Sequence, residues 1–169
     1  MKTVCKKDQC AGCKACVDIC SKKAIQVVDS VVAYNAIIDE DKCVNCGACQ
    51  KICQENKLPV QLEPIAWKEG WASDQKIREK SSSGGVATAM ELAFVNNGGT
   101  VCSCSLENGE FCFSFAQTEK EVIKFTGSKY VKSNPKGIYR KILDKLKKGG
   151  NVLFVGSPCQ VAAVKNFGG

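Results

Sequence analysis

Runs of apolar and β-branched residues divide the chain into two groups of expected elements. In the first group, Ala24–Val28 and Val32–Ile38 are rich in β-forming residues and are separated by Asp29 and Ser30, which predicts a β-hairpin. The next stretch, Gln54–Trp71, has no sustained period and contains two prolines, which predicts a linker or an extended crossing segment. We expect its two tryptophans to be buried against a domain surface, because an indole ring contributes a large apolar area when it is covered.

The second group mixes helices and strands. It begins with a helical stretch, Val86–Val95, that is closed by two asparagines and two glycines. The first two strands that follow are expected to form a hairpin around Glu107–Gly109. The last part has a strand, a glycine-containing turn and a helix in succession, which is where α/β proteins bind ligands. The expected segments after the first helix are strands at Thr100–Ser105, Phe111–Thr118 and Val122–Phe125, a helix at Pro135–Lys148, a strand at Asn151–Val155, and a turn at Gly156–Gln160 that leads into a final helix.

Cysteine spacing carries the clearest chemistry. Eight of the 13 cysteines form two copies of C-x2-C-x2-C-x3-C, and the second copy follows the first by 33 residues at all four positions. Three closely spaced thiolates can hold three corners of an iron–sulfur cube, and in this spacing the fourth cysteine normally serves the other cluster. We also expect the fourth cysteine to start a helix that leads away. The predicted ligand sets are Cys10, Cys13, Cys16 and Cys53 for one [4Fe-4S] cluster, and Cys43, Cys46, Cys49 and Cys20 for the other.

Two other uses of these cysteines are less consistent with the pattern. Zinc sites usually have two separated C-x2-C pairs and often include histidine, whereas this chain has unbroken runs and no histidine. A disulfide framework would suit an exported protein, but the start, Met1–Cys5, is too short and too polar for a secretory signal. We therefore expect metal binding in a reducing compartment, the cytoplasm. Cys5 fits neither copy of the repeat and is expected to be a buried or inert thiol.

Charge and hydropathy exclude two classes of function. The formal net charge is +7, but two oxidised clusters with four thiolates each would reduce it to about +3. The lysines are spread along the chain, so no nucleic-acid partner is expected. A weaker alternative is a docking surface for an acidic redox partner. No apolar run approaches the roughly 18 residues of a membrane span.

Residues 1–62 resemble a bacterial-type ferredoxin with two [4Fe-4S] clusters, on the strength of the eight-cysteine pattern. The proline that commonly follows the fourth cysteine in that family is Ser21 in one copy and Gln54 in the other. Proline would stiffen the turn without binding iron, so its absence leaves the expected clusters intact.

Three later phrases resemble a second family. SSSGGVATAM, GSKYVKS and VLFVGSPCQVAAVK, in this order over residues 78–165, are similar to the β-subunit family of coenzyme F420 hydrogenases and dehydrogenases. The resemblance implies a flavoprotein that binds FAD and passes electrons between iron–sulfur clusters and a two-electron substrate. It places anion-binding or flavin and substrate contacts on Ser82, Ser83, Gly84, Gly85, Ser128, Lys129, Tyr130, Gly156, Pro158, Cys159 and Gln160.

Two of these positions also have plainer interpretations. Unpaired N–H groups at a helix start suit an anion, but serine is also the commonest helix cap, and on this signal alone the cap is favoured. Cys159 at a strand-to-helix turn could be a redox thiol or a ligand of a third [4Fe-4S] cluster. Its candidate co-ligands Cys102, Cys104 and Cys112 are individually better explained as packed strand cysteines.

The expected architecture is α+β: a ferredoxin-like two-cluster domain at 1–62, a linker at 63–77, and a partial α/β flavin-binding-type domain at 78–169. The family continues beyond the PCQ turn, so the chain is expected to be a fragment or an early-terminated product. The predicted function is an iron–sulfur flavoprotein oxidoreductase subunit, or part of one, that relays electrons to FAD and a substrate such as coenzyme F420. Its expected partners are a redox protein or hydrogenase and dehydrogenase subunits. The alternative is a ferredoxin-type carrier or adaptor whose second domain only docks onto a partner enzyme.

Overall fold

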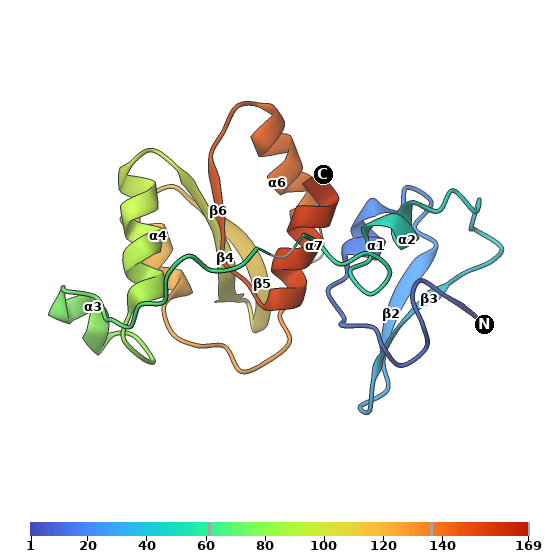
Figure 1. The fold of residues 1–169 in the computed structure, drawn as a ribbon, viewed down its shortest axis with the longest axis horizontal. Helices are drawn as coiled ribbons and strands as arrows, with labels where there is room; N and C mark the ends of the chain where they lie inside the picture. The colour runs from blue at the N-terminus through green and yellow to red at the C-terminus, as the bar shows by residue number, and fades with distance from the viewer. Residues whose placement is uncertain (61, 136, 169) are drawn as a thin grey trace. The chain divides into compact units, whose positions relative to one another are not determined.

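The computed structural model describes residues 1–60, 62–135 and 137–168, and these form two compact units (Figure 1). The first unit comprises Met1–Val60, Pro135–Leu143 and Ser157–Gly169, and the second comprises Gln61–Asn134 and Asp144–Gly156. Each unit contains one three-stranded sheet among the described residues. The fold is therefore mixed, with small sheets and short helices, and is compatible with the expected α+β class. No helix in the described part of the chain is long and apolar enough to cross a membrane.

The sheet of the first unit has the strand order β1-β3-β2 and is antiparallel. Its strands are β1 (Lys2–Thr3), β2 (Ile25–Asp29) and β3 (Tyr34–Ile38). The predicted hairpin is confirmed, with Ile25 opposite Ile38 and Asp29 opposite Tyr34. The inward side chains of this sheet form the core with Val4 and Cys16, and several partly buried cysteines pack against it.

Two short helices carry the third cysteine of each run. They are α1 (Ala15–Ile19) and α2 (Ala48–Ile52), and each ends where the fourth cysteine, Cys20 or Cys53, leaves the helix in an extended conformation. The expectation that the fourth cysteine starts a helix is therefore wrong. A residue in the left-handed region stands before each helix, so the chain turns sharply into the helix instead of after it.

Two helices from the end of the sequence contribute to the first unit. They are α6 (Ile138–Lys147), which begins three residues after the predicted start and belongs to this unit up to Leu143, and α7 (Pro158–Gly168). Tyr139 and Phe167 stack with their ring centroids 5.8 Å apart, and both are buried. The Tyr139 hydroxyl donates to the carbonyl of Cys13 at 2.7 Å. The Asn166 side chain donates to the carbonyls of Ile52 and Lys57, so α7 is bonded to the end of α2.

The buried carboxylate of Asp18, on α1, accepts hydrogen bonds at the start of α6. Its two oxygens receive the backbone N–H groups of Gly137 at 2.6 Å and Tyr139 at 3.3 Å. These groups have no partner within their own helix, because the first N–H groups of any helix lack one. A negative charge is also favourable at the positive end of the helix. Asp18 therefore serves as a helix cap supplied from a residue 119 positions away in the sequence.

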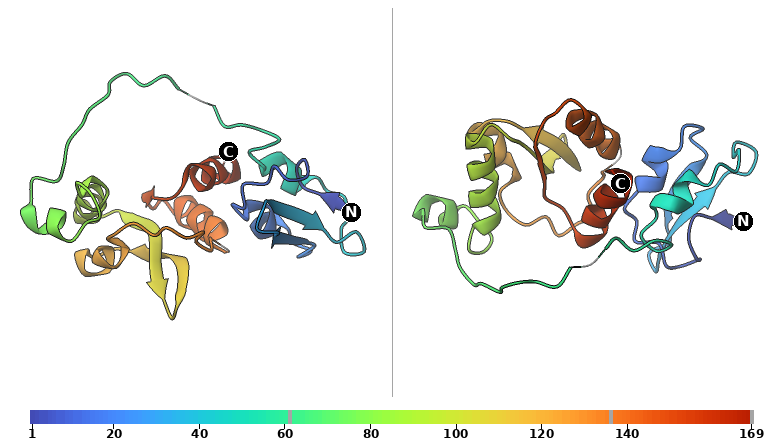
Figure 2. Two further views of the ribbon diagram at one scale, coloured as in Figure 1. Left: turned by 90° about the horizontal axis from the view of Figure 1, so that it is seen from below. Right: turned by 45° about the horizontal axis from the view of Figure 1, so that its top comes forward.

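The second unit has the strand order β5-β4-β6, with β4 antiparallel to β5 and parallel to β6. Val101, Ala116, Val122 and Phe125 form its core with Val95. Helix α4 packs against β4, as Figure 2 shows from two directions. The predicted first helix, the hairpin and the final strand are confirmed. The elements are α3 (Gln75–Glu79), α4 (Val86–Asn96), β4 (Thr100–Glu107), β5 (Glu110–Ala116), α5 (Glu119–Val122) and β6 (Val152–Phe154).

Two expectations for this unit are wrong. Val122–Phe125 is not a strand: it is the end of α5 followed by a 3-10 turn at Ile123–Phe125. Thr118 and Glu121 form a capping box that starts a helix ahead of this apolar run, and the local cap outweighs the β-forming residues. The tryptophans of the predicted linker are not buried either, since Trp67 is 87% and Trp71 is 72% exposed.

The compact units and the predicted domains divide the chain differently. The predicted domains at 1–62 and 78–169 are continuous, whereas each compact unit is assembled from separate segments. Residues 62–74 contain no helix or strand, as expected for an extended segment. The predicted domain boundaries were drawn from resemblance to two sequence families and not from compactness. They therefore stay a prediction.

We predict that Asp18→Asn destabilises the first unit. The amide retains one acceptor oxygen but turns an N–H group toward another N–H group, which leaves a buried donor unpaired at a cost of about 1–3 kcal/mol. The thermal midpoint, followed by far-UV circular dichroism under anaerobic conditions, should fall. Amide exchange at Gly137 and Tyr139 should become faster.

Asp144→Asn is the matched control. Asp144 lies exposed in α6, the helix that Asp18 caps, and is away from the first turn of that helix. It should leave both measurements unchanged. An Asp18→Asn variant with wild-type stability and exchange would contradict the proposed role of the cap.

Candidate functional site

The two cysteine runs share one backbone conformation. Two residues in each run have positive φ: Gly12 (68°) and Lys14 (61°) in the first, and Asn45 (53°) and Gly47 (73°) in the second. Gly12 corresponds to Asn45 in the repeat, and Lys14 to Gly47. The same turns are therefore made in both copies, although glycine stands at a different position in each.

This conformation points backbone N–H groups at cysteine sulfur. Gly12 N–H donates to Cys10 Sγ and Asn45 N–H donates to Cys43 Sγ, both at 3.4 Å. Ala24 N–H makes a third such bond, to Cys20 Sγ, also at 3.4 Å. Donors of this kind stabilise a thiolate that binds metal.

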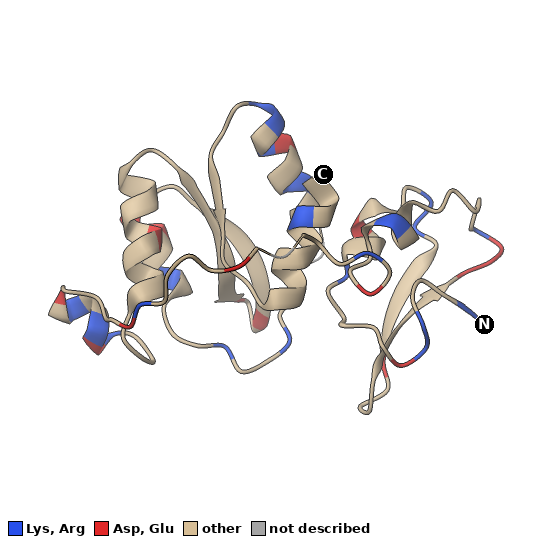
Figure 3. Cartoon of the chain, in the orientation of Figure 1, with Lys and Arg blue, Asp and Glu red and all other residues tan. Residues whose placement is uncertain are grey.

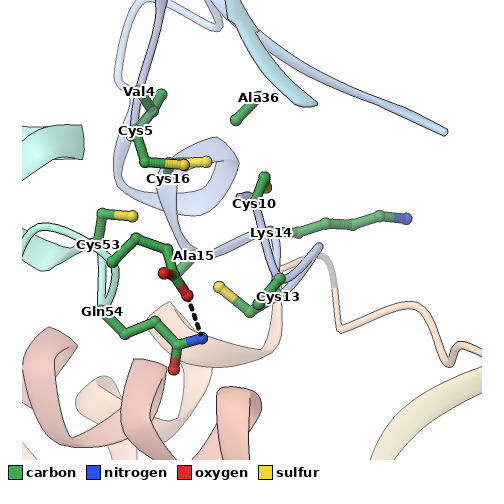
Figure 4. Close-up of a pocket in the computed structure, with 12 residues that line it drawn as sticks. Val4, Cys5, Cys10, Cys13, Lys14, Ala15, Cys16, Ala36, Cys53 and Gln54 are labelled. Carbon is green, nitrogen blue, oxygen red and sulfur yellow. Dashed lines mark hydrogen bonds between the residues drawn. The ribbon is translucent and has the colours of Figure 1, made fainter. Parts of the chain in front are cut away.

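The first cavity is surrounded by sulfur. Figure 4 shows cysteine side chains around it that come from the segment after β1, the first run and the end of the second run. The cysteines that line it are Cys5, Cys10, Cys13, Cys16 and Cys53. About 330 Å³ of its space is free of protein atoms, including the part open to solvent.

The second cavity is lined by the opposite combination of the two cysteine runs. Three of its cysteines come from the second run and one from the first, and they are Cys43, Cys46, Cys49 and Cys20. About 500 Å³ of its space is free of protein atoms, again including the open part. Val44 and Cys46 are exposed at its rim. The structure thus brings together the same groups of four cysteines that the spacing predicts.

The composition of the two cavities fits a cofactor that is held by several sulfur ligands. In the described part of the chain, no three His, Cys, Asp or Glu side chains are gathered closely enough for a single metal ion. Each set of four thiols instead surrounds a space. Soft sulfur ligands around such a space match an iron–sulfur cluster.

Burial makes three thiols of the first cavity, Cys5, Cys13 and Cys16, hold their protons when no metal is bound. It raises the pKa of Cys13 to about 11, although the N–H group of Ala15 partly offsets the shift. Burial raises the pKa of Cys5 to about 12 and that of Cys16 as well. A thiol must lose its proton to bind metal, so loading of this site should release protons and be favoured at higher pH.

In the second unit, the serine and glycine residues before α4 lie beside the turn at Gly127–Ser128. Ser82 Oγ accepts a hydrogen bond from the N–H group of Ser128 at 2.8 Å, which joins two of the three phrases singled out in the sequence. Gly85 precedes α4 with φ of 74° and no side chain caps the helix. The interpretation of the serines as simple helix caps is therefore wrong. Among the described residues, no side chain caps the first N–H groups of α4.

Three other predicted residues of this region differ in their surroundings. Ser83 and Tyr130 are exposed, and Tyr130 has 92% of its surface free. Gly84 packs closely on the preceding segment, because a Cβ atom there would lie 3.2 Å from the carbonyl oxygen of Gly70. A side chain at Gly84 would therefore push the two segments apart.

Lys129 extends from the same turn into a partly buried polar cluster. Its ammonium group donates to the carbonyls of Phe125 and Thr126. Burial lowers the pKa of Lys129, while the neighbouring Cys104 and Glu91 act in the opposite direction. Glu91 lies on α4 with only 3% of its surface exposed, and burial raises the pKa of this carboxyl despite its hydrogen bond with Ser103.

The PCQ turn belongs to the first unit from Ser157 onward. Gln160 is buried, and its side-chain oxygen accepts from the N–H and hydroxyl groups of Ser157, both at 2.9 Å. Cys159 Sγ lies 3.2 Å from Ser157 Oγ and is close enough to Cys13 to raise the pKa of that thiol. Gly156, the residue before this turn, lies in the second unit and is exposed.

The candidate co-ligands of a third cluster lie on the hairpin of the second unit. Cys102 and Cys104 are on β4, and Cys112 is on β5 opposite Ser105. Cys102 is completely buried. This is the surrounding expected for a packed strand cysteine.

Three residues of these sites were missed in the sequence. Asp18 and Glu91 were detectable as single charges within otherwise apolar helical stretches, VDI and MELAF. The hydroxyl bond of Tyr139 to the first cysteine loop had no signal in the sequence, because it joins residues 126 positions apart.

Comparison with known families identifies two segments of the chain. Residues 9–57 match the 4Fe-4S dicluster domain. Residues 68–136 match the N-terminal domain of the coenzyme F420 hydrogenase/dehydrogenase β subunit. Both resemblances that the sequence predicted are confirmed. No curated protein matches the chain. A domain that holds two [4Fe-4S] clusters, followed by a segment of an oxidoreductase subunit family, gives the chain a redox role in electron transfer.

We predict that Gly47→Ala weakens the second cysteine loop. No atom lies within 4 Å of the added methyl group, so the cost is the conformational strain of φ at 73°. That strain amounts to about 1–2 kcal/mol, and it should lower the thermal midpoint by about 2–8 °C. The midpoint is measured from the loss of visible absorbance on anaerobic heating.

Gly70→Ala is the control, because Gly70 has equal space and no positive φ. It should change the midpoint little. The reciprocal variant Lys14→Gly should not lower the midpoint, since the change removes strain at the equivalent position. A Gly47→Ala midpoint equal to that of wild type would refute the strain argument.

Proposed function

We propose that the chain is an iron–sulfur flavoprotein oxidoreductase subunit, or part of one. It relays electrons between two [4Fe-4S] clusters, FAD and an organic two-electron substrate such as coenzyme F420. The observation that carries the proposal is the reciprocal grouping of eight cysteines around two cavities, on a chain whose next segment matches the coenzyme F420 β-subunit family.

The eight cysteines of the two runs supply the cluster ligands. Cys10, Cys13, Cys16 and Cys53 hold one cluster, and Cys43, Cys46, Cys49 and Cys20 hold the other. Support comes from the lining of the cavities and from the N–H groups aimed at sulfur in both loops. Cys5 also lines the first cavity, but it lies outside the repeated run and is assigned no ligand role.

FAD binding is assigned to the second family segment and the PCQ turn. A flavin exchanges electrons singly with iron–sulfur clusters and in pairs with organic substrates, which makes it the converter that this chemistry requires. The N–H groups at the start of α4, uncapped by side chains, suit a phosphate group of the cofactor. The contact residues are Ser82, Ser83, Gly84, Gly85, Ser128, Lys129, Tyr130, Gly156, Pro158, Cys159 and Gln160.

The residues themselves have distinct parts in this proposal. Ser82 fixes the Ser128 turn beside the helix start. Lys129 places a positive charge in the same region, which favours an anionic ligand or a reduced anionic cofactor. Buried Glu91 is a candidate for holding a proton close to that charge.

The family name also indicates protein partners. The matched family is described as a β subunit, so a hydrogenase or dehydrogenase partner subunit is proposed for this chain. Figure 3 shows lysines and arginines distributed over helices and loops and interspersed with acidic residues.

The first test is to measure iron, acid-labile sulfide and flavin on one anaerobically purified sample. About eight irons and one flavin per chain are expected. Eight irons without flavin would leave a two-cluster carrier or adaptor, and about twelve would indicate a third cluster. Zinc in place of iron would refute the proposal.

Paired cysteine variants test the reciprocal assignment. If Cys13 and Cys53 serve one cluster, the Cys13→Ala/Cys53→Ala protein should keep about four irons, as each single variant does. The Cys20→Ala/Cys53→Ala protein should lose nearly all, because it damages both sites. Equal retention in the two double variants would contradict the assignment.

A further inference from the structure

The two cysteine cavities are equivalent position by position. Ten of the twelve residues that line the first cavity have a counterpart 33 positions away that lines the second. The cysteines correspond in order, including Cys53 with Cys20. The two cavities are therefore copies of one arrangement, and we call them the first and the second cage. The differences between the cages are confined to a few side chains.

One difference, the pair Cys5 and Ile38, changes the number of buried thiols. Both are buried, at 6% and 5% exposure, and both line their cavity. One cage thus contains a fifth thiol where the other contains a hydrocarbon side chain. The further differences are Lys14 for Gly47, Ala11 for Val44, Gln54 for Ser21, and Glu55 for Lys22.

The Cys5 thiol lies near two of the proposed ligands. It lines the same cavity as Cys10 and Cys53, and burial raises its pKa, as do the neighbouring thiols of Cys53 and Cys10. Figure 4 shows the three side chains at the wall of the same cavity. When the neighbouring sulfurs are thiolates bound to iron, they can only accept hydrogen bonds, so Cys5 is the one thiol of the three that can donate.

The backbone around Cys5 is held in place. Val4 N–H donates to the carbonyl of Ala36 at 2.9 Å, and the Thr3 hydroxyl donates to the carbonyl of Cys5 at 2.7 Å. The Asn56 side chain donates to the carbonyl of Val4 at 3.0 Å. The thiol is thus presented to the cage from a segment after β1 that hydrogen bonds hold in place, which is the condition for a preorganised donor.

We propose that the Cys5 thiol raises the reduction potential of the cluster held at the first cage, whereas Ile38 gives the second cage no such donor. This inference rests on the proposed occupation of both cages by [4Fe-4S] clusters. One-electron reduction adds one negative charge that the ligand sulfurs share, and no proton needs to move. A hydrogen bond to those sulfurs is stronger when they are more negative, so it stabilises the reduced form.

The exposed charges of the two cages act in the opposite direction. Glu55 lies at the first cage, and Lys22 lies at the equivalent place in the second. Both side chains are exposed, so water and salt screen their effect. The contribution of Cys5 is therefore measured as a change within one cage and not as the difference between the two cages.

The test is an anaerobic redox titration of the intact chain, followed by EPR spectroscopy, with dithionite and mediators as the electron source. In Cys5→Ala, one cluster should become harder to reduce. At a fixed ambient potential its ratio of reduced to oxidised form should fall about tenfold, which is about 59 mV for one electron. Cys5→Ser, which keeps an O–H donor, should restore part of the loss.

The reverse change supplies the matched experiment. Ile38→Cys places a thiol in the second cage, and it should raise the potential of the cluster that Cys5→Ala leaves unaffected. Cys112→Ala is the control, since it removes a thiol that lines neither cavity. It should leave both midpoints unchanged. Ile38→Cys also keeps the proposal testable if the Cys5 variants do not accumulate.

The proposal is overturned if Cys5→Ala leaves both midpoints in place or shifts both equally while iron content remains that of wild type. Loss of about half the iron in both Cys5→Ala and Cys5→Ser would also overturn it, because Cys5 would then be a ligand. A failure of the proposed function would be distinguished from a failure of this inference. In that case the wild-type protein itself would contain no iron–sulfur clusters.

Discussion

Convergence of four sulfurs on one space is the constraint on which the first unit depends. A cysteine run of this spacing can close around a cavity only if its backbone reverses twice within five residues, and left-handed residues make those reversals. Lys14 and Asn45 have positive φ and are therefore strained, whereas glycine at these positions would not be. The core of the unit is small, and several of its contacts are made by the cysteines themselves. The same cysteines therefore shape the cages and stabilise the unit, and bound metal contributes to both.

Much of the fold was predictable because its signals are local. Alternating β-forming residues and a short turn identify the β2–β3 hairpin, and the second hairpin and α4 have equally local patterns. The errors arose where a local signal of another kind prevailed. The Thr118 capping box starts a helix ahead of an apolar run that resembles a strand. The tryptophans of the extended segment were expected to be buried because their side chains are large. A large side chain is buried only where another surface packs against it, and the sequence did not identify such a surface.

The groups of four cysteines were predictable for a different reason. Repetition of one spacing, 33 residues apart, identifies a known arrangement without any knowledge of the fold. Contacts that depend on tertiary structure were not predictable. The placement of α6 and α7 in the first unit requires Asp18, Tyr139 and Asn166 to meet groups more than 100 positions away. The chemical role of Cys5 likewise became visible only when the two cages could be compared residue by residue.

The discontinuous make-up of the first unit has a consequence for biosynthesis. Both cysteine runs are synthesised by residue 53, but the helices that carry Tyr139 and Phe167 are synthesised more than 80 residues later. During translation the first cage therefore has all of its thiols and lacks the Tyr139 hydroxyl bond that secures the Cys13 loop. Iron–sulfur assembly factors would have their best access to the site in that interval, before the late helices dock. Later synthesis then adds the hydroxyl bond that secures the Cys13 loop.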